Sequence, residues 1–198
     1  MRQFQLRIIS FLIISFLIPS VAFATAPAEE PAFIRSSSQK GVTVSTDVLL
    51  VAMPVATLAG VIIEKDWKGL VQGAYTAAAT AGATFILKYS VKEWRPDRSN
   101  HHSFPSGHTA VTFATAAFVQ RRYGWKLGIP AYALSTYVGW GRVFSKKHHW
   151  WDVLAGAAIG AGSAYIFTKP WARDHNLSIG PVFDPETESV GITASFTL

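Results

Sequence analysis

The stretch FPSGHTAVTFATAAFVQ, residues Phe104–Gln120, joins a polar turn to an uncharged apolar segment. Ser106 is of a residue type that caps helix N-termini, and Gly107 lets backbone N–H groups approach an anion at that end of a helix. The segment that follows is rich in Ala, Val and Thr and predicts a helix. His108 would then lie in the first turn, close to any anion bound there.

Four other segments share this uncharged apolar character: Val48–Ile63, Gly69–Leu87, Leu127–Gly141 and Val153–Thr168. As a helix, Val48–Ile63 would span about 24 Å, whereas a bilayer core is roughly 30 Å thick, and flanking residues such as 42–47 would lengthen it. All seven tryptophans lie near segment ends, which is typical of residues at a membrane interface. These features predict an all-α fold, a membrane helical bundle of about five or six helices.

The N-terminal residues 1–24 have an export pattern. Two arginines, Arg2 and Arg7, precede an apolar run that ends in Ala22-Phe23-Ala24, which fits the small-x-small cleavage rule. We interpret 1–24 as a signal peptide or a first anchor helix and residues 25–41 as a linker.

The remaining chain divides into a helical core and a tail. We expect the helical core at residues 42–170, with Gly156 and Gly160 forming a small-residue face for close helix packing. Residues 171–198 differ, because apolar residues alternate with smaller or polar ones on both sides of Asp184-Pro185-Glu186. This pattern predicts a C-terminal tail with a small β-hairpin.

Composition limits the partners and the chemistry. The chain of 198 residues is 49% hydrophobic and 15% charged, and its net charge is +6. A net positive charge favours anionic partners. The basic residues lie in small groups between apolar segments and form no continuous basic surface, which argues against nucleic acid as the partner. The chain has no cysteine, so disulfides and thiolate chemistry are excluded.

Basic residues recur in the loops between the apolar segments. If the N-terminus is inside, helix-by-helix alternation puts Lys88, Arg95 and Arg142 outside, where topology rules do not call for positive charge. These three cations, with Ser106 and Gly107, have the donor groups that stabilise the spread charge of a phosphate in its transition state. We expect the other outer cations to face water: Lys92, Arg98, Lys146 and Lys147.

A nucleophile and an acid accompany these cations. His148 and Asp152 are four residues apart and share a helix face if the helix begins near His148. A carboxylate that accepts the proton of one ring nitrogen leaves the other nitrogen bare and more basic, which makes His148 the best nucleophile. His108 can protonate the departing oxygen as a general acid.

A metal site was weighed against this chemistry, because six groups could supply ligands: His101, His102, His108, His148, His149 and Asp152. There is no HExxH pair and no cysteine, so we expect no metal and no cofactor.

The three clusters together resemble the tripartite signature of the type 2 phosphatidic-acid phosphatase superfamily, K-x6-RP, PSGH and SR-x5-H-x3-D. Lys88 and Arg95-Pro96 match the first part, Pro105–His108 the second, and Arg142, His148 and Asp152 the third. Gly141 stands where the signature has Ser.

The resemblance implies an all-α core, usually of six membrane helices with the site facing out, and a phosphohistidine intermediate formed without metal. It implies that His148 is the nucleophile, Asp152 its orienting base and His108 the acid. It also implies a set of phosphate ligands: Lys88, Arg95, Ser106, Gly107 and Arg142.

From this resemblance we expect a metal-independent phosphatase acting on a lipid phosphomonoester or diphosphate of the phosphatidate, undecaprenyl diphosphate or lipid A type. We expect it in the bacterial inner membrane with its site facing the periplasm. The alternative is a soluble periplasmic non-specific acid phosphatase with the same mechanism. Neither the exact substrate nor the oligomeric state follows from the sequence.

Overall fold

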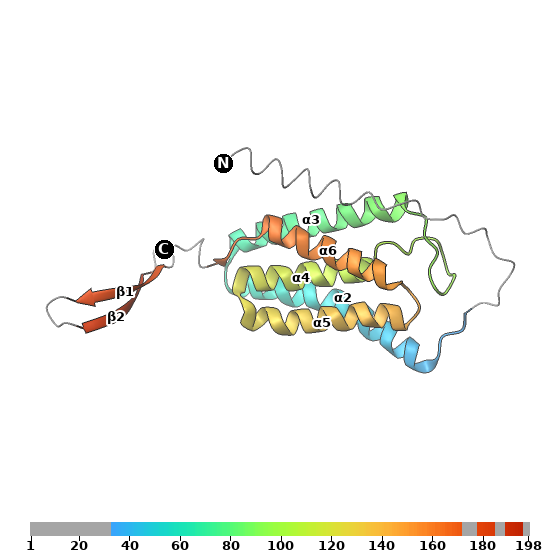
Figure 1. Ribbon diagram of the computed structural model, residues 1–198, viewed down its shortest axis with the longest axis horizontal. Helices are drawn as coiled ribbons and strands as arrows, with labels where there is room; N and C mark the ends of the chain where they lie inside the picture. The colour runs from blue at the N-terminus through green and yellow to red at the C-terminus, as the bar shows by residue number, and fades with distance from the viewer. Residues whose placement is uncertain (1–32, 172–177, 185–188, 196–198) are drawn as a thin grey trace. The chain divides into compact units, whose positions relative to one another are not determined.

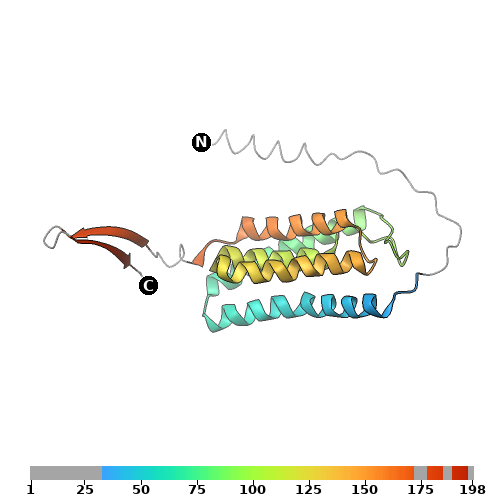
Figure 2. The ribbon, with the colours of Figure 1, turned by 60° about the horizontal axis from the view of Figure 1, so that its bottom comes forward.

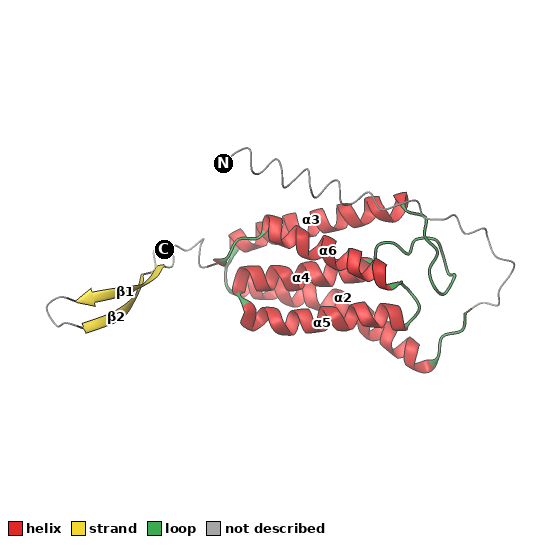
Figure 3. Ribbon diagram, viewed as in Figure 1, coloured by secondary structure: helices red, strands yellow, loops and turns green. Residues whose placement is uncertain are grey.

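The computed structural model describes residues 33–171 and the backbone of residues 178–184 and 189–195. The predicted signal peptide or anchor, and the linker up to residue 32, lie outside the described residues. Residues 33–171 form five α-helices, and the longest loop between them, residues 91–106, joins α3 to α4 (Figures 1 and 3). The helices are α2 (Ser37–Ile63), α3 (Trp67–Ser90), α4 (Gly107–Tyr123), α5 (Trp125–Phe144) and α6 (Trp150–Phe167).

Helix α2 begins earlier than the sequence pattern indicated. Ser36 accepts a hydrogen bond from the Gln39 backbone N–H, and the Gln39 side chain accepts one from the Ser36 backbone N–H. This capping box satisfies two N–H groups that would otherwise lack partners at the helix start. The helix therefore starts at Ser37, inside the stretch expected to be linker.

Helix α4 is at the centre of the bundle and packs against each of the other four described helices. Figure 2 shows α6 and α2 on opposite sides of it. The helix suits this position because its alanines, Ala110, Ala114, Ala116 and Ala117, are buried and leave room for close neighbours.

Helix α6 approaches α4 most closely through its glycines. A Cβ added at Gly160 would lie 2.1 Å from the Ala110 carbonyl oxygen, and one added at Gly156 would lie 2.5 Å from that of Ser106. Backbones this close leave no room for a side chain, so the predicted small-residue face is confirmed. The contact also fixes the start of α6, which carries Asp152, against the start of α4.

Two of the described helices, α2 and α3, are long and apolar enough to cross a membrane, judged by length and composition. They expose large apolar side chains, among them Val51, Ile63, Phe85 and Ile86. That the three shorter helices also span a membrane stays a prediction.

The end of the bundle where α2 turns into α3 contains a buried ion pair. Arg122 donates to both carboxylate oxygens of Asp66, at 2.7 and 2.5 Å, and Tyr123 donates to the same carboxylate. Arg122 also donates to the Lys169 carbonyl, 3.0 Å away. These bonds connect the α2–α3 turn with the ends of α4 and α6.

The tail contains two strands, β1 (Ser178–Asp184) and β2 (Ser189–Ser195), which pair antiparallel with Ser178 opposite Ser195. That this hairpin is a stable part of the fold stays a prediction.

Candidate active site

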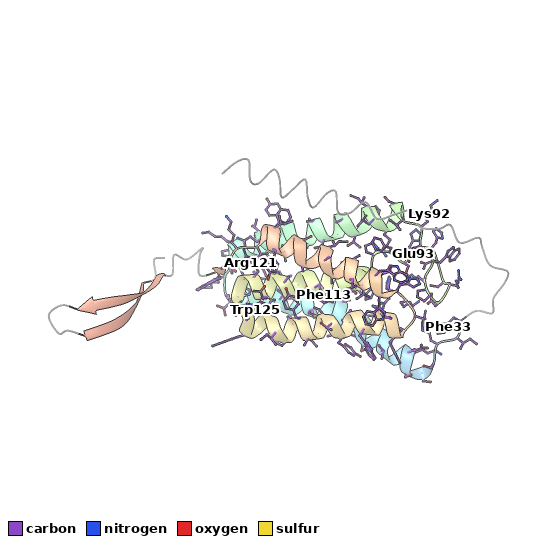
Figure 4. The ribbon with its side chains drawn as sticks, in the orientation of Figure 1. Phe33, Lys92, Glu93, Phe113, Arg121 and Trp125 are labelled. Atoms are coloured by element: carbon purple, nitrogen blue, oxygen red, sulfur yellow. The ribbon has the colours of Figure 1, made fainter. Side chains whose placement is uncertain are left out.

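The three sequence clusters meet at one end of the bundle. Lys88 lies in the last turn of α3, His108 in the first turn of α4, and Arg142 in the last turn of α5. His148 lies in the loop between α5 and α6, and Asp152 lies in the first turn of α6. Figure 4 shows Lys92 and Glu93 at this end and Arg121 and Trp125 at the opposite end.

His148 and Asp152 form a buried pair. Nδ1 of His148 lies 3.4 Å from Oδ2 of Asp152, and both side chains are almost fully buried. Burial, with the charges of Arg95 and Arg142, lowers the pKa of His148 to about 4, although the Asp152 carboxylate acts in the opposite direction. The imidazole is therefore neutral at neutral pH. Nδ1 is the ring nitrogen next to the carboxylate, although it makes no hydrogen bond of ordinary geometry among the described residues, and Nε2 is the nitrogen left for attack.

Asp152 is held from two sides. Its Oδ2 accepts from the Ser103 hydroxyl at 2.5 Å and from the His149 backbone N–H at 2.8 Å. Its backbone carbonyl accepts from the Ser106 N–H at 2.9 Å, which links the start of α6 to the start of α4. These bonds fix the carboxylate beside His148.

Ser106 and Lys88 shape the turn before α4. The Ser106 hydroxyl caps α4 through the Thr109 N–H and lies 2.9 Å from the Thr109 hydroxyl, so the predicted N-cap is confirmed. Lys88 donates to the carbonyls of His102 and Pro105, at 3.1 and 2.8 Å. Lys88 also lies within electrostatic reach of both Arg95 and Arg142. The turn thus lies among the three predicted cations.

The two arginines are buried to different degrees. Arg142 is almost fully buried, and Arg95 is partly buried in the loop after α3. In both side chains Nε is buried and has no hydrogen-bond acceptor among the described residues. Buried donors of this kind are costly unless an acceptor reaches them. An anion with several oxygens would satisfy both.

A second ion-pair network holds the loops in place. Asp97 pairs with Arg35 and, at 3.2 Å, with Lys147. Burial raises the pKa of Asp97, but hydrogen bonds from Ser99 and Lys147 outweigh it, and the pKa falls to about 2. Lys92, Arg98 and Lys146 are exposed as expected. For Lys147 the prediction was wrong, because the lysine next to His148 turns inward to Asp97.

Two residues near the site were missed by the sequence reasoning. Asp47 of α2 lies 2.8 Å from His108 Nε2 and accepts from Arg142 at 2.8 Å. Ser103 holds Asp152. Asp47 had one signal, a single carboxylate directly before an uncharged apolar segment. Ser103 had none, because a serine in a loop is ordinary.

One group of side chains could hold a cation: Glu93, His149 and Asp152 each place a ligand atom within 4.8 Å of the others. Burial raises the pKa of Glu93 to about 7, against the hydrogen bond from Trp151, which lowers it. A raised pKa makes Glu93 a weaker cation ligand, because a carboxyl must lose its proton to bind a metal. The residues expected to hold phosphate form a separate set.

Comparisons with known proteins agree with the motifs. The model of the PAP2 superfamily matches residues 69–174, more than half of the chain. The lipid A 1-phosphatase of Porphyromonas gingivalis is 37% identical over 100 residues, covering 48% of this chain and 22% of that protein. The lipid A 4'-phosphatase of Helicobacter pylori is 32% identical over 116 residues, covering 53% of this chain and 59% of that protein. The chain spans less than two thirds of either relative.

Two solved structures share the fold. LpxE of Aquifex aeolicus has a TM-score of 0.58 at 20% identity, covering 67% of this chain and 86% of that one. The transmembrane PAP2 type phosphatidylglycerolphosphate phosphatase of Bacillus subtilis has a TM-score of 0.53 at 22% identity, covering 69% of this chain and 78% of that one. The motifs, their meeting at one end of a helical bundle and the family match agree: the chain belongs to the PAP2 superfamily, the type 2 phosphatidic-acid phosphatases.

Proposed function

We propose that this protein is a phosphatase that removes phosphate from a lipid through a phosphohistidine intermediate. One observation carries the proposal: a buried, neutral His148 lies next to Asp152 and within electrostatic reach of Arg95 and Arg142. A neutral imidazole surrounded by cations suits attack on an anionic phosphorus.

In the first step the lone pair of His148 Nε2 forms a bond to phosphorus while the bond between phosphorus and the lipid oxygen breaks. The electron pair of that bond goes to the lipid oxygen, which takes a proton from His108. Asp152 stabilises the positive charge that develops on the His148 ring. Lys88, Arg95 and Arg142 stabilise the equatorial oxygens together with the Gly107 backbone N–H, which the Ser106 turn presents at the start of α4.

In the second step water attacks the phosphorus and gives a proton to His108. The bond between Nε2 and phosphorus breaks, its electron pair returns to His148, and inorganic phosphate leaves. His108 is then protonated for the next cycle, so no metal or cofactor is required.

The apolar surfaces of the helical bundle suit a lipid substrate, and they include a groove that extends toward the α2–α3 turn. A groove of about 470 Å³ lies between α2, α3 and α4, lined almost entirely by apolar atoms, among them those of Leu58, Ala77, Val111 and Phe118. The outer faces of α2 and α3 are apolar as well. The names of the two bacterial relatives, a lipid A 1-phosphatase and a lipid A 4'-phosphatase, support a lipid A type substrate. We place the protein in the bacterial inner membrane with the site facing the periplasm.

The test is phosphate release by the purified full chain in detergent. Phosphatidate, phosphatidylglycerol phosphate, undecaprenyl diphosphate and lipid A are compared with p-nitrophenyl phosphate. We expect release from at least one lipid, undiminished by EDTA, and a radiolabelled protein adduct that is labile to acid and stable to alkali. Turnover confined to p-nitrophenyl phosphate would contradict the lipid assignment, and loss in EDTA restored by zinc would contradict the metal-free mechanism.

Localisation needs a separate measurement. We expect the protein to stay in the membrane fraction after an alkaline wash. Release by that wash would favour the soluble periplasmic alternative.

A further inference from the structure

Asp47 brings a second carboxylate to the site from a helix that carries none of the three motifs. Its Oδ1 lies 2.8 Å from His108 Nε2 and accepts from Arg142 Nη1 at 2.8 Å. The side chain is 52% exposed. It is therefore not a buried structural ion, and its second oxygen is free to meet solvent.

The contact with Arg142 leaves the rest of the guanidinium for an anion. Arg142 uses the same nitrogen, Nη1, toward Asp47 and, at 3.5 Å, toward Thr46. Its Nε is buried without an acceptor among the described residues. Nε and Nη2 lie along one edge of a guanidinium and donate in parallel, the arrangement that matches two phosphate oxygens. Asp47 thus fixes the orientation of Arg142 without occupying that edge.

The contact with His108 fixes which nitrogen moves the proton. A carboxylate only accepts hydrogen bonds, so Nε2 of His108 carries hydrogen in this contact. Proton transfer to and from substrate then falls to Nδ1, and an acid with hydrogen on both nitrogens is an imidazolium. An adjacent carboxylate favours that charged form, whereas burial and the charges of Arg142 and Arg95 disfavour it.

We infer that Asp47 is a positioning residue that orients His108 for proton transfer and contacts Arg142 only through a nitrogen outside its phosphate-binding edge. The pair of Asp47 and His108 then parallels the pair of Asp152 and His148: each imidazole has one nitrogen held by a carboxylate and the other turned to the reaction. This inference rests on the proposed function.

The close approach of α2 to α5 makes the contact possible. A Cβ added at Gly141 would lie 2.6 Å from Thr46 Cγ2 and 2.9 Å from Val42 Cγ1. Gly141 is the position at which this chain departs from the Ser of the family signature. The missing side chain lets α2 bring Asp47 alongside Arg142, so the departure and the extra carboxylate belong together.

The test compares Asp47→Asn with the wild-type full chain in detergent, with phosphatidate or whichever panel lipid the wild type hydrolyses. We expect kcat to fall about 10- to 100-fold, less than the roughly 100- to 10,000-fold that proton transfer contributes, because His108 itself remains. The basic limb of the pH–rate profile should move to lower pH, because the imidazolium loses its counter-charge. The Kd for inorganic phosphate, measured by calorimetry, should stay the same or fall, because a negative charge has left the site.

Two further variants complete the test. Asp47→Glu keeps the charge and should recover part of the kcat and the basic limb. Ser45→Ala, in the same helix, removes a hydroxyl that lies 2.8 Å from the Tyr137 hydroxyl outside the site, and should behave as wild type.

The outcomes separate the inference from the function. If the wild type releases phosphate from none of the substrates, the proposed function fails. If the wild type is active and Asp47→Asn keeps its kcat and pH profile, this inference is overturned. Loss of phosphate binding in Asp47→Asn would also overturn it, since the residue would then support the fold of the site rather than proton transfer.

Discussion

Gly141 of α5 faces Thr46 of α2 so closely that a Cβ atom on Gly141 would lie 2.6 Å from Thr46 Cγ2. A residue at position 141 with any side chain must therefore displace the side chains of Thr46 and Val42 or move α2, the helix that carries them. Because α2 carries Asp47, the spacing of two helices and the geometry of the site depend on the same contact.

Replacing Gly141 with Ser should restore the family signature yet damage this protein. We expect Gly141→Ser to lower the free energy of unfolding by about 1–3 kcal/mol, as overpacking does, and to lower kcat as well. Thermal unfolding in detergent and phosphate release measure the two effects. The matched control is Gly162→Ala in α6, where a Cβ meets nothing within 4 Å. A Gly141→Ser variant as stable and active as wild type would refute the tight contact.

His148→Asn should abolish turnover, because it removes the ring nitrogen that attacks phosphorus in the proposed mechanism. We expect activity at least about 1,000-fold below wild type with thermal stability largely kept. Weak binding of vanadate should remain, since the cations are untouched. His101→Asn, in an exposed part of the loop before α4, is the control. Substantial residual turnover in His148→Asn would remove His148 as nucleophile.

Ser103→Ala removes the 2.5 Å hydrogen bond to Asp152 Oδ2. The buried carboxylate then loses a partner, which costs about 1–3 kcal/mol of stability, and its hold on His148 loosens. We expect kcat to fall several-fold with little change in KM. Ser90→Ala, whose exposed hydroxyl donates only to the Ile86 carbonyl, should show neither effect. Equal kinetics for the two variants would show that Asp152 needs no support from Ser103.

The acid limb of the pH–rate profile should reflect His148. Its pKa lies at about 4 because of burial and of the charges of Arg95 and Arg142, so on the acid side kcat/KM should fall as the ring becomes protonated near pH 4. Arg95→Gln removes one of the charges that lower this pKa, so the limb should move to higher pH. Rates between pH 3.5 and 8 test this, and a limb unmoved in Arg95→Gln would place Arg95 away from His148.

The ion pair between Asp66 and Arg122 should matter for stability alone. Both side chains are buried, at 1% and 0% exposed, so Asp66→Asn leaves a buried guanidinium without its counter-charge, and we expect a loss of about 3–5 kcal/mol. Well below its melting temperature, the variant should keep the wild-type kcat. Glu64→Gln, an exposed neighbour, is the control for charge. A lower kcat in folded Asp66→Asn would show that the two ends of the bundle are coupled.

Much of this arrangement could be predicted from the sequence, because it follows from local patterns. The apolar segments became helices, Ser106 became the cap of α4, and Gly156 and Gly160 became the close contact with α4. The separations within each cluster are short and fixed by helical geometry. The meeting of the clusters at one end could be predicted from helix-by-helix alternation, which puts the loops that carry them on the same side.

What could not be predicted depends on contacts between distant segments. The inward turn of Lys147 depends on Asp97, fifty residues earlier in the chain, and the support of Asp152 depends on Ser103 in another loop. Asp47 lies 61 residues before His108, and no local period relates them. The start of α2 was placed too late because the polar residues that cap and begin it do not share the apolar pattern of its interior.

The reactive groups come from four helices and two loops, and no single segment contains more than two of them. Catalysis is therefore a property of the assembled bundle and would disappear as soon as helices slide or part, while each helix could remain intact. When detergents are compared, the loss of turnover should precede any change in far-ultraviolet circular dichroism. The enzymatic rate is therefore a more sensitive measure of intact helix packing than the helix content is.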